Sequence, residues 1–366
     1  MNRTLVILRY PIFASALVGL VTGIWAGLIR IGWWFPFSEH IPLEAHGPLM
    51  VSGFLGIVIG LERAVGLNQK WNYLAPALTG IGVLGVIVGL PSPLPRLLIT
   101  LGSLVFVLIS LRIVQIRKAM FTVTMALGAL ALYVGNMLWM LGHPIFNAVY
   151  WWGAFLIFTI AGERLELARI VQVSKVGRIL FTMMVTLLAM GLIIVSFSPE
   201  TGVFLTGAGM AGIGLWLLRY DIARKTVRTA GLPRFTATNL LIGYIWLSVS
   251  GTLAIWFGAV DSGPQFDAIL HSLFLGFVFS MIFGHAPMIF PSLLQVPMLF
   301  HWSFYLHVVL LHITLLVRVG GDLSGWFTGR SLGGLMNAAV LALFFLNTGI
   351  AIIRGKRAEK VAYQKE

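Results

Sequence analysis

Long apolar runs recur along the whole chain, separated by short breaks that carry charged residues, glycine or proline. Each run is about 20 residues long, the length that a helix needs to cross roughly 30 Å of hydrocarbon. The pattern predicts an all-α, polytopic membrane protein of about twelve transmembrane helices. Because no polar stretch is long enough for a soluble domain, residues 1–366 are expected to form a single transmembrane domain ending in a short cytoplasmic tail, 355–366. The predicted spans are 11–32, 46–66, 73–91, 96–114, 120–141, 146–168, 178–197, 202–219, 237–259, 267–290, 302–319 and 332–354.

Basic residues fall on one side of this arrangement. When successive helices alternate in direction, nearly all Lys and Arg side chains lie on the side of the N-terminus, and only Arg30, Arg96, Arg318 and Arg330 lie opposite. Cytoplasmic segments of membrane proteins are enriched in Lys and Arg, so both termini are predicted to be cytoplasmic. The net charge of +13 is then a topology signal, and no nucleic-acid partner is expected.

The composition narrows the chemistry. Hydrophobic residues make up 58% of the chain and charged residues 10%, whereas soluble domains carry roughly 25% charged residues. Cysteine is absent, which excludes disulfides, iron–sulfur clusters and thiolate ligands. Any metal would have to be held by His, Met, Tyr or carboxylate groups.

Small residues recur at four-residue spacing in the second and tenth predicted spans, and a titratable residue follows the last small residue each time. The sixth span ends in a similar way. Because these spans are four helices apart, they suggest three four-helix arcs around a pseudo-threefold axis. The alternative is ordinary close packing, since small residues let helices approach one another in lipid. The residues concerned are Ser52, Gly56, Gly60, Gly162, Gly276, Ser280 and Gly284.

Histidines inside the predicted spans are the main candidates for chemistry, because ionisable groups within a bilayer are costly and are functional candidates by default. His46 and His271 open the second and tenth spans near the outer face, and His312 lies in the outer half of span eleven. Neutral imidazole is a common ligand of haem iron and of copper. This outer layer therefore predicts a cofactor pocket, with His46 and His271 as haem ligands that could form a facing pair. His312 would complete that pocket or serve a nearby copper.

A second group of histidines lies toward the middle of the membrane and the cytoplasmic side. His285, His301 and His307 are candidates for a second, inner metal site. Five of the eight histidines fall between His271 and His312, which favours a site in this part of the chain. The alternative is that these imidazoles only form hydrogen bonds between helices or reach interfacial water. His143, in an outer loop, is expected to have no such role.

Three parts of the chain resemble the NnrS family, multi-spanning bacterial membrane proteins that contain haem and copper and are linked to nitric oxide and denitrification. The first part is residues 271–277, His-Ser-Leu-Phe-Leu-Gly-Phe, followed by the Gly-His pair at 284–285. The second is Leu-His at 311–312 with Val-Arg-Val at 317–319, and the third is the histidine-led segment 44–56. After the Gly-His pair, this chain has Ala-Pro where that family usually has Thr-Gly-Arg.

The resemblance implies a location in the bacterial inner membrane, crossed many times and surrounded by lipid. It implies bound haem, most simply of b type, with copper as a further candidate, and nitric oxide or another small diatomic molecule as ligand. That family is similar in architecture to the catalytic subunit of haem–copper oxidases, which has twelve helices in three arcs. This chain has no adjacent His-His pair and no His-x-His in its tenth span, so oxygen reduction is not expected.

Three functions stay open at this point. The resemblance implies a role in denitrification or nitrosative stress. If the protein is an enzyme, it is an oxidoreductase acting on nitric oxide at a haem centre, with electrons from a quinol or cytochrome donor. A haem-bearing sensor or assembly protein without turnover is the second function. The third is a cofactor-free secondary transporter that uses the intramembrane histidines, because broken helices and midplane polar groups also mark transport sites.

Overall fold

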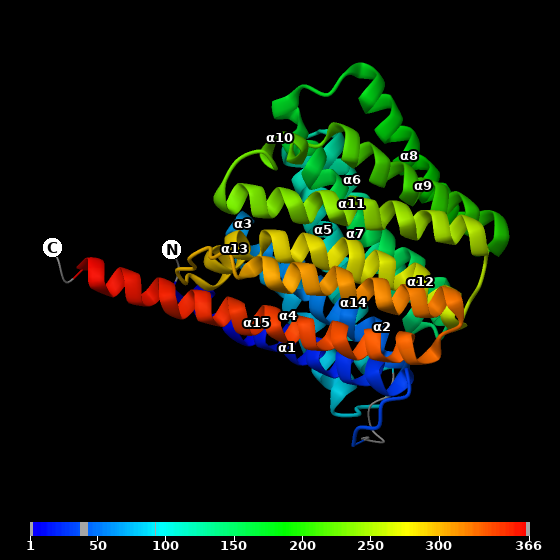
Figure 1. Ribbon diagram of the computed structural model, residues 1–366, viewed down its shortest axis with the longest axis horizontal. Helices are drawn as coiled ribbons and strands as arrows, with labels where there is room; N and C mark the ends of the chain where they lie inside the picture. Colours follow the sequence, from blue (N-terminus) through cyan, green and yellow to red (C-terminus); the bar gives the residue numbers. More distant parts are fainter. Residues whose placement is uncertain (1–2, 37–42, 92, 364–366) are drawn as a thin grey trace. The chain divides into compact units, whose positions relative to one another are not determined.

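The computed structural model describes residues 3–36, 43–91 and 93–363, and this part of the chain is helical with no strand. Eleven of its helices are long and apolar enough to cross a membrane. The prediction of an all-α, multi-pass membrane protein is therefore confirmed. Where the sequence predicts one transmembrane domain, the contacts within the chain form two compact units: unit 1, Met1–Glu166, and unit 2, Leu167–Glu366 (Figure 1).

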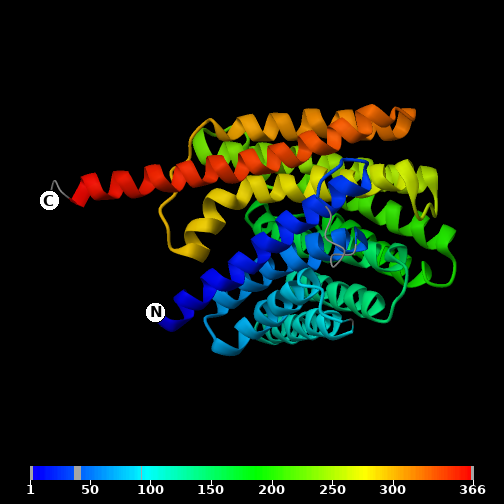
Figure 2. The same cartoon turned by 90° about the horizontal axis from the view of Figure 1, so that it is seen from below.

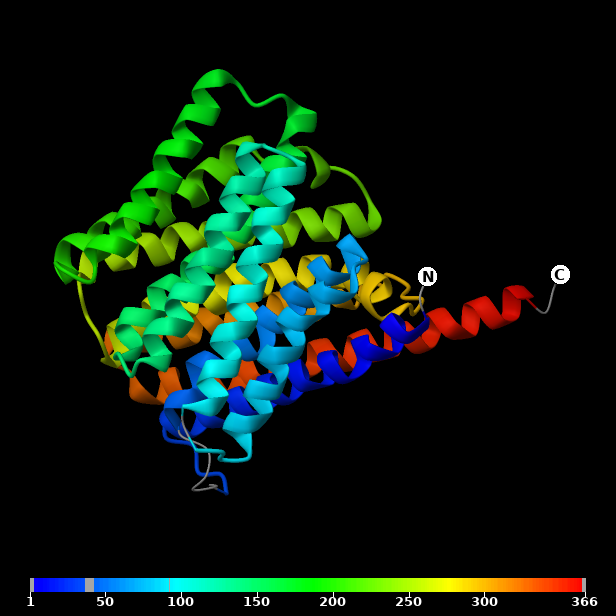
Figure 3. The ribbon, with the colours of Figure 1, turned by 180° about the vertical axis from the view of Figure 1, so that it is seen from behind.

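Unit 1 begins with α1, the dark blue helix at the N-terminus in Figure 3, which carries a stripe of glycines. Gly19, Gly23 and Gly27 recur every four residues and face the second span, whose backbone can approach closely because these positions have no side chain. The unit contains α1 (Arg3–Arg30), η1 (Leu43–Ala45), α2 (His46–Pro48), η2 (Leu49–Gly56), α3 (Ile57–Leu67), η3 (Lys70–Tyr73), α4 (Leu74–Ile87), α5 (Leu94–Ile116), α6 (Met120–Met140) and α7 (Ile145–Ala168).

The third predicted span, 73–91, is the one that differs most from the structure. Its α-helix, α4, has 14 residues and is therefore about 21 Å long, shorter than the hydrocarbon core of a bilayer. α4 runs antiparallel to α5, because Thr79 lies beside Gly102 while Gly82 lies beside Ile99. Eleven spans reach full length in the described residues, so the even number of crossings stays a prediction.

In unit 2 each long helix packs against the next one along the chain (Figures 1 and 2). α15 continues to Tyr363, so residues 355–363 of the predicted tail extend this helix, and 364–366 lie outside the described residues. The unit contains η4 (Arg169–Val171), α8 (Lys175–Ile194), α9 (Pro199–Tyr220), α10 (Ala223–Thr226), α11 (Gly231–Phe257), α12 (Gly263–His271), η5 (Ser272–Phe279), α13 (Ser280–Leu294), α14 (Phe304–Ser324) and α15 (Phe327–Tyr363).

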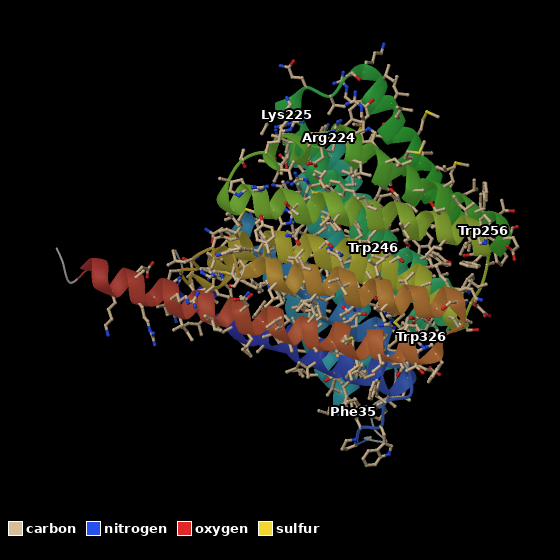
Figure 4. All side chains as sticks on the ribbon, viewed as in Figure 1. Phe35, Arg224, Lys225, Trp246, Trp256 and Trp326 are labelled. Carbon is tan, nitrogen blue, oxygen red and sulfur yellow. The ribbon has the colours of Figure 1, made fainter. Side chains whose placement is uncertain are left out.

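The two ends of unit 2 differ in chemistry. Trp256 and Trp326, 81% and 55% exposed, lie at one end, and the exposed cations Arg224 and Lys225 lie at the other (Figure 4). Tryptophan is enriched at membrane interfaces, and Lys and Arg are enriched on the cytoplasmic side. This is the distribution expected of a membrane-spanning unit whose basic end faces the cytoplasm.

In the described residues, each unit contains one eight-residue π-helical segment that begins within three residues after a histidine. η2 begins three residues after His46, and η5 begins one residue after His271. π-Helical hydrogen bonds run from residue i to i+5, are rare, and often occur at functional sites. α7, the sixth predicted span, is α-helical from Ile145 to Ala168. The similarity is therefore shared by predicted spans two and ten, one in each unit, whereas the sequence suggests three equivalent arcs.

Candidate functional site

His271 is held by the residue one helical turn before it. Its Nδ1 lies 3.0 Å from the backbone oxygen of Asp267 and 3.2 Å from the Oδ1 atom of the same residue. Both of these atoms accept hydrogen bonds, so the ring donates from Nδ1 and Nε2 carries the lone pair. Metal-binding histidines commonly have this arrangement, because the second-shell acceptor fixes the tautomer and the orientation of the ring.

The carboxylate of Asp267 belongs to a buried ion-pair network of α12, α14 and α15. Arg318 donates to both of its oxygens, from Nε at 2.9 Å and from Nη2 at 3.0 Å, in the two-pronged geometry typical of strong pairs. Arg330 lies 3.8 Å from Asp267 and 3.0 Å from Asp322. The side chains of Asp267 and Arg318 are 13% and 9% exposed, and that of Asp322 is fully buried. The Asp267 carboxylate thus compensates the Arg318 guanidinium beside His271, and Arg330 lies against both Asp267 and Asp322.

His46 in unit 1 has the same tautomer as His271. Its Nδ1 lies 2.7 Å from the backbone oxygen of Gly23, which can only accept, so Nε2 carries the lone pair. Gly27 makes room for the ring, because a Cβ atom at that position would lie 2.8 Å from two of its atoms. The predicted facing pair of His46 with His271 stays a prediction.

His312 has the opposite tautomer. The indole Nε1 of Trp246, which can only donate, lies 3.1 Å from His312 Nδ1, so the ring proton is on Nε2. That Nε2 is buried and has no hydrogen-bond partner among the described residues. The Trp246 ring packs against Gly276 of η5. Because a protonated Nε2 cannot bind a metal, this geometry favours a hydrogen-bond donor over the predicted ligand role.

The three histidines of the predicted inner metal site have separate surroundings. His285 donates from Nδ1 to a backbone oxygen at 2.8 Å, whereas exposed His301 accepts at Nδ1 from the Ser303 N–H at 3.2 Å. His307 is 1% exposed, and its Nδ1 lies 3.4 Å from the Asn347 amide nitrogen. The rings around His307 are those of Phe235, Phe283, Phe304 and Phe344.

Within the described residues, no group of three or more His, Asp or Glu side chains is arranged to hold a metal ion. Of the three inner histidines, His285 alone has the tautomer that leaves Nε2 as the lone-pair atom. An inner site formed by His285, His301 and His307 therefore remains a prediction. His46 in unit 1 and His271 in unit 2 each donate from Nδ1 to a backbone oxygen, the arrangement that metal-binding histidines commonly have.

Two buried polar contacts could not be predicted from the positions of the histidines alone. In α6, the Oδ1 atom of Asn136 accepts from Ser52 Oγ at 2.6 Å and from Trp152 Nε1 at 3.0 Å, which ties η2 to α6 and α7. Trp246 and His312 are 66 positions apart, so no local pattern connects them. The contact of Asp267 with His271 could have been predicted, because the two are four residues apart and such residues are neighbours on a helix.

Comparison with known proteins identifies the family of the chain but gives no activity. No curated protein matches the sequence. The sequence model of one family, described as a domain of unknown function (DUF8744), matches residues 9–353. This range includes all the intramembrane histidines and both π-helical segments. The chain therefore belongs to the DUF8744 family.

Proposed function

We propose that this protein is a haem-binding integral membrane protein that acts on or responds to nitric oxide, with His46 and His271 as iron ligands. The observation that carries the proposal is the second-shell support of His271. Its Nδ1–H donates to Asp267, and the Asp267 carboxylate accepts two hydrogen bonds from the Arg318 guanidinium. Such support is what metal-binding histidines use. Bound haem would supply an iron atom able to take up a diatomic ligand at a coordination position that is open or that one histidine vacates.

The residues around the proposed ligands have defined tasks. Asp267 keeps the His271 ring in the ligand tautomer, and Arg318 compensates the buried carboxylate. The backbone oxygen of Gly23 accepts the His46 hydrogen bond, and Gly27 leaves space for the His46 ring against α1. His312, locked by Trp246 with its proton on Nε2, can donate a hydrogen bond to an acceptor atom of a bound molecule.

The nitric oxide part of the proposal is supported by the resemblance of residues 271–285, 311–319 and 44–56 to the NnrS family. Turnover would need an electron donor, a quinol or a cytochrome, and a sensor or assembly protein would need none. Anaerobic addition of nitric oxide to the reduced protein separates these roles. Consumption of nitric oxide indicates an oxidoreductase, whereas a stable spectral shift without consumption indicates a sensor.

Single substitutions test the ligands. His271→Ala and His46→Ala should each lose the Soret band or shift it, because each removes an iron ligand. His143→Ala is the matched control, since this histidine is exposed in a loop, and its spectrum should equal that of the wild type. A His271→Ala protein with wild-type haem content and spectrum would refute the assignment.

A cofactor-free secondary transporter is the second candidate, because the unit 2 network buries two Asp–Arg pairs at a membrane-spanning helix end. Buried charges in membranes mark substrate and proton pathways, and interrupted helices mark transport sites. α13 contains Pro287 and Pro291 inside the helix, and each removes a backbone N–H donor from it. Absence of a Soret band after expression with ample haem would favour this function over haem binding.

A further inference from the structure

A shallow groove runs along the exposed face of α8, is lined by residues of that helix, and does not take part in the proposed haem site. It has a volume of about 550 Å³, with Lys175 and Arg178 at one end and an apolar wall beyond them. Ile179, Met183 and Met190 of this wall are each about half exposed. α8 thus presents a charged end and an apolar length in one continuous surface.

The groove has the dimensions of a lipid. From Lys175 to Met190 it covers 15 helical steps, or about 22 Å along the axis. One leaflet of hydrocarbon is about 15 Å deep, because the whole core is about 30 Å. The remaining length corresponds to the headgroup region, which is where the two cations lie.

The charge at this end of unit 2 is strongly one-sided. α8 contains no acidic residue, and its N-terminus adds the positive end of a helix dipole. Within unit 2, Asp221 is 3% exposed and accepts from a backbone N–H, while Glu359 of α15 is exposed. The exposed cations of the described residues on this side of unit 2 are Arg169, Lys175, Arg178, Arg219, Arg224, Lys225, Arg228, Arg234, Arg354, Lys356, Arg357 and Lys360.

We infer that the α8 groove is a binding site for an anionic phospholipid of the predicted cytoplasmic leaflet. The phosphodiester group contacts Lys175 and Arg178, and an acyl chain lies along Ile179, Met183 and Met190. A soluble phosphate would use only the charged end, and a neutral lipid only the apolar wall. The site uses both ends of the groove, so it selects a lipid that carries a negative headgroup. This inference does not depend on the proposed haem function.

Phosphatidylglycerol titrated into the full-length protein in phosphatidylcholine nanodiscs, with bound lipid counted by native mass spectrometry, tests the site. K175Q/R178Q should weaken phosphatidylglycerol binding about thirtyfold, because each cation near a membrane surface contributes about a factor of five. R224Q/K225Q is the matched control: it removes two exposed cations from the same end, outside the groove (Figure 4). The control should change binding less than about twofold at the site.

A third variant tests the apolar wall with the charges left in place. Met183→Trp fills the groove and should also weaken binding of the lipid, whereas soluble glycerol phosphate should not displace it. Equal losses in the two double variants would show general surface attraction and overturn the inference. Displacement by glycerol phosphate would overturn it too, because the anion alone would then suffice. Unchanged unfolding midpoints confirm that the variants are folded.

Discussion

Asp267→Asn removes one charge from the buried network beside His271 while keeping the shape of the side chain. The substitution leaves the Arg318 guanidinium, 9% exposed, without its bidentate partner. Removing one member of a buried ion pair costs about 3–5 kcal/mol, because the remaining charge is desolvated and uncompensated. Arg330, 3.8 Å away, adds to the uncompensated positive charge. We therefore expect a loss of unfolding free energy toward the upper part of this range.

Titration with sodium dodecyl sulfate, followed by tryptophan fluorescence of the purified protein, measures this loss. Glu166→Gln is the matched control, because the Arg117–Glu166 pair has the same chemistry with side chains 50% and 36% exposed. An exposed pair contributes about 0–1 kcal/mol. The two variants should therefore differ by about 2 kcal/mol or more.

The double variant D267N/R318Q sharpens the test. Replacing both partners should cost less than the sum of the two single losses, since no unpaired charge is then left buried. If Asp267→Asn costs no more than Glu166→Gln, the network is not a buried ion pair in the membrane, and the support assigned to His271 is refuted. In the haem-loaded protein, Asp267→Asn should also make the midpoint potential more positive, because the neutral amide makes His271 a less basic ligand.

The remaining predictions concern the packing around the histidines. Gly27→Val should lower the haem content, because its Cβ would lie 2.8 Å from ring atoms of His46; an unchanged haem-to-protein ratio would contradict this seat. Gly276→Ala should displace the Trp246 indole that packs there, and a blue-shifted or quenched fluorescence of that tryptophan, compared with a Trp246→Phe reference, would reveal the displacement. His307→Phe should change the unfolding free energy by less than about 1 kcal/mol and leave the metal content unchanged. The reason is that an apolar ring replaces a buried ring whose Nε2 has no hydrogen-bond partner among the described residues. A loss of copper in that variant would instead support the predicted inner metal site.

The helices could be predicted because the membrane imposes a length on apolar runs. The edges of most predicted spans lie within a few residues of the observed helices. Span 73–91 was too long because hydropathy continues through Leu90, while the helix ends at Ile87 and Gly89 has a φ of 75°. A turn of this kind depends on one glycine, and an average over the window does not detect it.

The candidate site was only partly visible in the sequence. His46 and His271 stood out as ionisable residues that open apolar spans, and Asp267 could have been found from its four-residue spacing. The π-helical segments were not predictable, because a shift from i+4 to i+5 hydrogen bonding follows from packing against other helices. The role of His312 was also hidden, since its tautomer is set by Trp246 from another helix. Sequence reveals which groups are present, and the partners decide what each nitrogen can do.

The haem content of the purified full-length protein tests the central proposal most directly. The protein is expressed with ample haem, extracted for haem, and analysed for iron and copper per chain. Haem binding through His46 and His271 predicts a Soret band, extractable haem, and iron in equal amount to that haem. A protein that is folded, by its unfolding midpoint, and contains neither haem nor iron would contradict the proposal.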